Sequence, residues 1–182
     1  MTDRHFSEMS HASVVDRYFT KRYVTDVNQK EGEDQCILMH SNRICVITVA
    51  PSHPILMEGK SVTNVNFKVN AHMDRLDNKV TGKAKKGAQM LDSRSLLCFV
   101  TCTDGSTYTL RSCIKGGLIE ANDQLVDHPE LLTQKPSTDG YIAIILTRLQ
   151  SHEQEMKKLL THEQYLTILK QRETKQSNGN TS

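Results

Sequence analysis

Cysteine and histidine are the residues of this sequence with the most potential for chemistry, yet their spacing does not build a metal site. Cys98 and Cys102 fall on one face of a predicted strand, too far apart along it for the tight loop of a Cys-x-x-Cys zinc site. The pairs His152-Glu153 and His162-Glu163 lack a second histidine one helical turn further on, so neither forms the metalloprotease motif. The spacing therefore predicts no metal and no other cofactor.

Patterns for nucleophilic or phosphate chemistry are missing as well. The sequence has no Gly-x-Ser-x-Gly elbow and no glycine-rich phosphate loop. Gly116-Gly117 is better explained as a tight entry into a strand, where one backbone approaches another closely. Eight histidines make chance proximity to serine or cysteine inevitable, so proximity alone carries no weight. We expect a protein that is not an enzyme.

Composition limits the class of partner and the compartment. The 182 residues suit one domain plus extensions, and the mean hydropathy of −0.50 indicates that part of the length lies outside the core. A net charge of +2 is too small to require nucleic acid or an anionic membrane, and we expect no sequence-specific nucleic-acid binding. No run approaches the ~20 apolar residues of a membrane span, so we expect no membrane insertion.

The five cysteines are scattered and odd in number, which favours buried reduced thiols over a disulfide framework. The N-terminus lacks the apolar stretch of a secretory signal, and its early acidic residues do not suit a mitochondrial presequence. The sequence therefore predicts a cytosolic or nuclear protein.

Positive charge is concentrated in one region. Six lysines and arginines between Lys68 and Lys86 face only Asp74 and Asp77. The densest part of the cluster is formed by Lys79, Lys83, Lys85 and Lys86. Two interpretations stay open: an ordinary solvated face and loop, or a patch for a partner or for nuclear import.

Short strands joined by turns make up most of the chain. Residues 36–40 and 44–49 form the clearest hairpin, and residues 61–69 alternate polar and apolar with one slip that indicates a bulge. Further strands are expected at 96–102, 108–110, 118–121 and 141–146. Asp104-Gly105 is a strong signal for a hairpin turn with a positive φ at the glycine. The pattern predicts an all-β sandwich or barrel.

The character of the sequence changes after residue 148. Ser151 and Gln154 indicate a capping box, and apolar residues recur at helical spacing as far as Leu169, so we expect a helix over 149–172. Residues 1–12 and 173–182 are polar and are expected to be disordered. The echo of residues 151–154 at 161–164 is interpreted as a coincidence of helix composition. Residues 156–159 resemble the Leu-Lys-Lys segment of WH2 actin-binding peptides, but an ordinary amphipathic helix is the favoured interpretation.

Residues 112–122, 123–125 and 128–131 resemble the second half of a lipoyl-carrier domain, above all the glycine-cleavage H-protein. This resemblance implies a mainly β fold, a barrel-sandwich hybrid (single hybrid motif) over 13–148 with an N-terminal arm and a C-terminal helix. A carrier has its lipoyl lysine at the tip of the hairpin before this strand. Here the tip reads Cys-Thr-Asp-Gly-Ser-Thr over 102–107, Gly105 occupies the lysine position, and no lysine lies between Lys86 and Lys115.

The whole chain resembles the abitram family more closely. The resemblance is carried by residues 15–20, 40–48, 79–83 and 134–143. It implies a non-catalytic protein that binds actin, influences actin polymerisation, filopodia and dendrite branching, and modulates transcription. It further implies residence in nuclear speckles and in the cytoplasm, including lamellipodia, growth cones and dendrites. The alternative is a lipoyl-carrier-like accessory protein of lipoate or glycine-cleavage metabolism.

Actin is acidic, so charge favours the lysine cluster as its contact. We therefore place the expected contact with actin, as monomer or filament, at Lys79, Lys83, Lys85 and Lys86. The competing position is Lys157 and Lys158 on the expected C-terminal helix.

Overall fold

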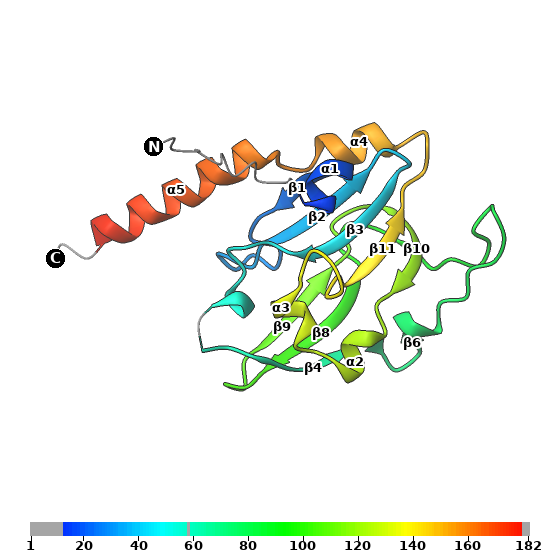
Figure 1. Cartoon of the computed structure of the whole chain (residues 1–182), viewed down its shortest axis with the longest axis horizontal. Helices are drawn as coiled ribbons and strands as arrows, with labels where there is room; N and C mark the ends of the chain where they lie inside the picture. Colours follow the sequence, from blue (N-terminus) through cyan, green and yellow to red (C-terminus); the bar gives the residue numbers. More distant parts are fainter. Residues whose placement is uncertain (1–12, 58, 180–182) are drawn as a thin grey trace, which may run out of the picture.

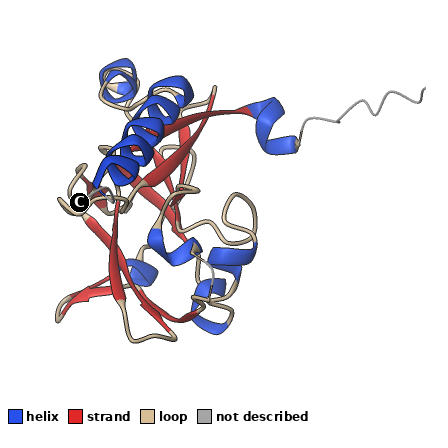
Figure 2. Cartoon of the chain, turned by 90° about the vertical axis from the view of Figure 1, so that its left-hand side faces the viewer, coloured by secondary structure: helices blue, strands red, loops and turns tan. Residues whose placement is uncertain are grey.

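Residues 13–57 and 59–179 are described by a computed structural model, and they form two antiparallel β-sheets with helices at both ends of the chain (Figures 1 and 2). The expected segment 1–12 lies outside the described residues. Among the described residues, no helix combines the length and apolar character that a membrane span needs.

The larger sheet has six strands in the order β1-β2-β3-β11-β10-β7. Their bounds are Phe19–Val24 (β1), Gln35–His40 (β2), Ile44–Val49 (β3), Ala143–Leu146 (β11), Gly116–Ala121 (β10) and Met90–Leu91 (β7). The expected hairpin is β2 and β3, paired with Met39 opposite Cys45. The segment expected to be either helix or strand near the N-terminus is both: helix α1 (Val14–Tyr18) runs directly into β1.

The smaller sheet has the order β4-β8-β9, with β4 at Val62–Asn66, β8 at Leu96–Cys102 and β9 at Thr107–Arg111. A register shift between Val62 and Asn64 is the bulge that the broken alternation indicates. A two-stranded ribbon, β5 (Lys68–Asn70) and β6 (Met73–Asp74), follows it. Short helices fill the connections: η1 (Pro54–Leu56), η2 (Arg75–Asp77), α2 (Gln124–Asp127) and α3 (Leu131–Gln134).

The two sheets pack face to face and do not close into a barrel. Strands β1 and β7 end the six-stranded order, so within residues 13–57 and 59–179 the architecture is an open sandwich. The core between the sheets is apolar, with Ile37, Ile47, Leu97, Leu110 and Leu118 fully buried. All five cysteines are buried and free, which suits their positions in apolar strands.

The C-terminal region differs from the single helix expected over 149–172. Two helices form, α4 (His152–Lys157) and α5 (His162–Gly179), and α5 continues through residues that we expected to be disordered. The side chain of Ser151 makes no capping bond. The capping box is at the echo instead: Thr161 N–H donates to Gln164 Oε1 at 2.9 Å, and Gln164 N–H donates to Thr161 Oγ1 at 3.2 Å. The echo is therefore a second helix start, because each copy precedes its own helix.

Tyr165 and Arg172 are two of the side chains that hold helix α5 to the six-stranded sheet and the loop before β2. Tyr165 stacks on Tyr23 of β1 with ring centroids 4.0 Å apart, and its hydroxyl lies 2.6 Å from Ser52 Oγ. Two turns on, Arg172 donates to Asp34 Oδ2 at 2.6 Å and to Asp26 Oδ1 at 2.7 Å. Beyond these contacts the helix runs away from the sheets (Figure 1).

Asp34 is fully buried, and burial alone would raise its pKa. Hydrogen bonds from Arg172, Ser52 and the Asp26 N–H outweigh that effect and hold the pKa of the carboxyl below its usual value. Asp34 is therefore an anion inside the protein, and its ion pair with Arg172 ties residues 138 positions apart.

The turn expected at Asp104-Gly105 joins β8 to β9. Gly105 has a φ of 81°, and no atom lies within 4 Å of the position that a Cβ would take. The conformation, and not crowding, is what requires glycine.

Replacing Gly105 should destabilise the protein through backbone strain alone. We expect Gly105→Val to lower the free energy of unfolding by about 1 to 3 kcal/mol, measured by urea denaturation. Gly105→Asn is the matched control and should cost less, since asparagine tolerates the left-handed region. Equal losses for valine and asparagine would contradict the strain argument.

Replacing Arg172 should leave the buried Asp34 carboxylate unpaired. We expect Arg172→Gln to lower the free energy of unfolding by about 3 kcal/mol at neutral pH. Because the lowered pKa of Asp34 stabilises the fold only above its unfolded value, the difference between the two proteins should shrink as pH falls below about 4. A constant difference across that range would show that the loss comes from packing instead.

Candidate functional site

The hairpin tip that holds the lipoyl lysine in carriers contains no lysine of its own, yet the fold brings one to it. Lys60, just before β4, places its Nζ 3.4 Å from Asp104 Oδ2, 3.4 Å from Ser106 Oγ and 2.5 Å from the Tyr108 hydroxyl. The same amine lies 5.0 Å from the centroid of the Tyr108 ring. Sequence reasoning gave this residue no role at the tip, because Lys60 lies more than forty positions before it in the chain.

The environment of Lys60 suits a structural role. The hydrogen bond to Tyr108, followed by that to Asp104, raises the pKa of the Lys60 amine. A charged amine with three acceptors is a poor nucleophile for acylation. Lys60 therefore holds the turn at Asp104 and Gly105.

Gly116 and Gly117 open strand β10 as a close backbone approach. A Cβ on Gly116 would lie 2.6 Å from Leu146 O on the neighbouring strand β11, so no larger residue fits there without displacement. Both glycines are buried, and their role is to let β10 pair with β11 and β7.

The four lysines of the sequence cluster lie together on a projecting loop, which we call the basic ribbon (residues 78–89). It runs out from the body of the sheets between η2 and β7, on the right in Figure 1. Lys79, Lys83, Lys85 and Lys86 are all exposed. No aspartate or glutamate lies between Asn78 and Leu91, so no acidic residue within the ribbon offsets the charge of its lysines.

Backbone bonds give the basic ribbon a defined tip. Thr81 and Lys86 exchange both backbone hydrogen bonds, at 2.9 and 3.0 Å, and close a tight turn. Gly82 and Lys85 have φ values of 70° and 50° in this turn. Gly87 also has a positive φ, and a Cβ there would lie 2.4 Å from Lys79 O. The two sides of the loop therefore approach each other at a position that only glycine can occupy.

Asn78 fixes the base of the ribbon to the six-stranded sheet. Its Nδ2 donates to Leu118 O at 2.7 Å, and its Oδ1 accepts from the Gln89 N–H at 2.8 Å. Gln89 in turn accepts from Arg75 Nη1 at 2.8 Å. The ribbon is therefore a positioned surface that starts from a hydrogen-bonded base.

The competing helical lysines have a different setting. Lys158 Nζ donates to Glu155 Oε1 at 2.8 Å, and the buried Glu155 also accepts from the Lys115 N–H at 3.0 Å. Lys158 thus neutralises a carboxylate that fixes α4 to the start of β10. Lys157 is exposed, so α4 offers one lysine where the ribbon offers four.

Catalytic chemistry finds little support in the described part of the chain. Burial raises the pKa of the Cys36, Cys45 and Cys113 thiols to about 12, which keeps them protonated. Residues 13–57 and 59–179 contain no group of three histidine, cysteine, aspartate or glutamate side chains placed to hold a metal. Figure 1 places the hairpin tip and the basic ribbon on opposite sides of the molecule, so the two do not form one site.

Comparison with known proteins shows which fold this chain resembles. The family described as "Glycine cleavage H-protein" matches residues 103–172. The crystal structure of a glycine cleavage system H protein from Mycobacterium marinum superposes with a TM-score of 0.54 at 14% identity, over 81% of this chain and 94% of that one. The expected mainly β, carrier-like hybrid fold with a C-terminal helix is therefore confirmed, as an open sandwich.

Curated relatives named "Protein Abitram" cover most of this chain. The Danio rerio protein is 50% identical over 88% of this chain and 90% of its own length. The Homo sapiens protein is 46% identical over 88% of each chain, and the Dictyostelium discoideum protein is 37% identical over 84% of this chain and 86% of its own. At these identities and coverages, the chain belongs to the abitram family.

Proposed function

We propose that this chain is a non-catalytic actin-binding protein that regulates actin polymerisation, filopodia and dendrite branching, and that modulates transcription in the nucleus. Membership of the abitram family supports this proposal. The carrier-like fold with Gly105 at the lipoyl position supports a binding role over a carrier role. The expected residence is the nucleus, including speckles, and the cytoplasm with its lamellipodia, growth cones and dendrites.

The basic ribbon is the proposed contact for actin. The observation that carries this placement is the set of four exposed lysines with no acidic residue among them, on a loop that stands clear of the sheets. Complementary charge speeds encounter with an acidic protein and favours that partner over a basic one. Salt should weaken the association, because the lysines are exposed to solvent.

Charge reversal on the ribbon tests the placement. We expect Lys83, Lys85 and Lys86→Glu to reduce cosedimentation with purified actin by about tenfold at low salt, since like charges then meet. Circular dichroism should show an unchanged fold.

A matched control changes the net charge by the same amount elsewhere. Lys157, Lys170 and Lys175 are exposed helical lysines, and their replacement by glutamate should leave cosedimentation near that of the wild type. Loss in this control with no loss in the ribbon variant would place the contact on the helices. Equal losses would mean that only overall charge matters.

The alternative function, a lipoyl-carrier-like accessory protein of lipoate or glycine-cleavage metabolism, makes an opposite prediction about modification. Gly105 cannot be acylated, and the amine of Lys60 is held by three acceptors. We therefore expect the intact mass of the protein, purified from cells that lipoylate their own carriers, to equal the unmodified value. A lipoyl or biotinyl increment would overturn this expectation and favour the alternative.

A further inference from the structure

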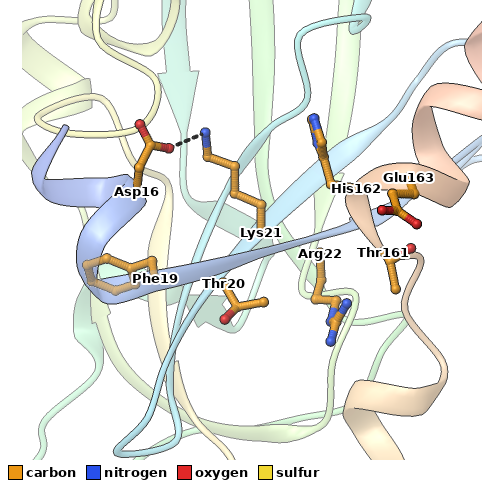
Figure 3. Close-up of a pocket in the computed structure, with 8 residues that line it drawn as sticks. All are labelled: Asp16, Phe19, Thr20, Lys21, Arg22, Thr161, His162 and Glu163. Atoms are coloured by element: carbon orange, nitrogen blue, oxygen red, sulfur yellow. Dashed lines mark ion pairs between the residues drawn. The ribbon is translucent and has the colours of Figure 1, made fainter. Parts of the chain in front are cut away.

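Strand β1 forms one edge of the six-stranded sheet, and a hollow of about 500 Å³ lies along it (Figure 3). Three successive strand residues, Thr20, Lys21 and Arg22, line this hollow. Side chains of successive strand residues point to opposite faces of a sheet. A hollow lined by all three therefore lies beside the edge of the strand and not over one of its faces.

The outward backbone groups of β1 are hydrogen-bonded near both ends of the strand, at Phe19 and at Tyr23. Tyr23 exchanges both backbone hydrogen bonds with Leu160, each at 2.9 Å, on the side away from β2. Because antiparallel residues alternate between the two sides, the N–H and C=O of Lys21 also point away from β2. Phe19 donates its N–H to Val15 O at the end of α1, which leaves its C=O on the same side.

Lys21 therefore sits in a gap between two covered positions. Among the described residues, the backbone bonds outside the regular strands and helices include none to Lys21. The hollow of about 500 Å³ lies at this gap and is bounded on one side by Thr161, His162 and Glu163. The antiparallel bridge of Leu160 to Tyr23 shows the geometry by which an extended segment pairs with β1.

The two faces of β1 present different charges to this gap. On the face of Lys21, its amine is neutralised by Asp16 at 2.9 Å, and His162 Nδ1 lies 3.0 Å from the Tyr23 hydroxyl. Glu163 lies beside His162, so this face does not attract an anion (Figure 3).

On the other face, Arg22 lies with the uncharged Thr20 and Thr161 (Figure 3). Its Nε is buried and has no hydrogen-bond partner among the described residues. A buried donor without an acceptor is costly, and a carboxylate is the natural partner of a guanidinium.

We propose that the β1 edge at Phe19–Arg22 binds an extended segment of a partner protein as an added antiparallel strand, with a carboxylate side chain paired to Arg22. The segment exchanges backbone hydrogen bonds with Lys21, as Leu160 does with Tyr23. Its side chains alternate, so the acid faces Arg22 and an uncharged polar residue faces Lys21 and Asp16. A second copy of this chain fits less well, because a two-fold pairing centred on Lys21 would oppose two lysines.

The test uses the full chain labelled with ¹⁵N and the probe peptide acetyl-Thr-Glu-Thr-Glu-Thr-amide, followed by NMR titration. We expect the amide signal of Lys21 to shift and its hydrogen exchange to slow when peptide is added. The same peptide with an N-methylated backbone should bind about tenfold more weakly, because it cannot donate to the strand. The peptide with glutamine in place of glutamate should also bind about tenfold more weakly, because it lacks the charge for Arg22.

Three variants separate backbone pairing from side-chain effects. Lys21→Pro removes an outward N–H and no hydrogen bond to β2, whereas Lys21→Thr keeps that N–H. Both variants lose the ion pair with Asp16. We expect the proline variant to bind the probe about tenfold more weakly than the threonine variant. In Arg22→Gln, the preference for the glutamate peptide over the glutamine peptide should disappear.

Three results would overturn the proposal. The first is equal binding by the proline and threonine variants when both retain the wild-type spectrum. The second, which does not depend on any variant folding, is equal binding of the N-methylated and unmodified peptides. The third is strong protection of the Lys21 amide before peptide is added, which would mean that this chain, including residues 1–12, already covers the edge.

Discussion

A buried side-chain amide, that of Gln35, joins the two sheets and satisfies the edge of one of them. Gln35 is fully buried at the start of β2; its Nε2 donates to Arg111 O at 2.8 Å and its Oε1 accepts from the Arg111 N–H at 2.9 Å. The side chain thus reproduces the pair of bonds that a neighbouring strand would make to β9. Asn28 extends this contact by donating to Thr109 O at 2.8 Å. Without these amides, partly buried backbone groups of Thr109 and Arg111 on the β9 edge would lose their partners, at a cost of about 1 kcal/mol each. The sheets can therefore remain open and still satisfy that edge.

Asp34, the residue before Gln35, makes a second contact with a residue far along the chain. Asp34 anchors α5 through Arg172, so two consecutive residues connect the six-stranded sheet to the smaller sheet and to the C-terminal helix. This arrangement leaves the sheet edges formed by β9, β7 and β1 in different states. The edge of β9 is bonded by the side chains of Gln35 and Asn28, and the edge of β7 is only two residues long. The edge of β1 is bonded at Tyr23, and among the described residues its Lys21 has no backbone partner on that side. Openness at a single place gives an added strand a defined position, because α1 and the Leu160 bridge limit it on either side.

The fold is similar to that of lipoyl carriers, but the lysines are placed differently. In this chain the hairpin tip is a glycine turn, and the lysine nearest to it is drawn inward by Tyr108 and Asp104. Free positive charge instead lies on the basic ribbon, whose base is fixed by Asn78 and whose turn requires Gly87. A scaffold that presents a charged loop on one side and an open strand edge on another is suited to contact with proteins, and it needs no reactive group for that role.

Sequence alone determined the features that depend on neighbouring residues. Period-two alternation identified the strands, Asp104-Gly105 identified the turn, and the lysine cluster identified the charge of the ribbon. Each follows from local backbone preference or local composition. Only the tertiary structure decided which of two similar capping sequences closes a box, where Lys60 is held, and how Gln35 and Arg172 find partners far along the chain. These outcomes depend on contacts between distant residues, and such contacts follow from how whole elements pack, a property that no short stretch of sequence contains.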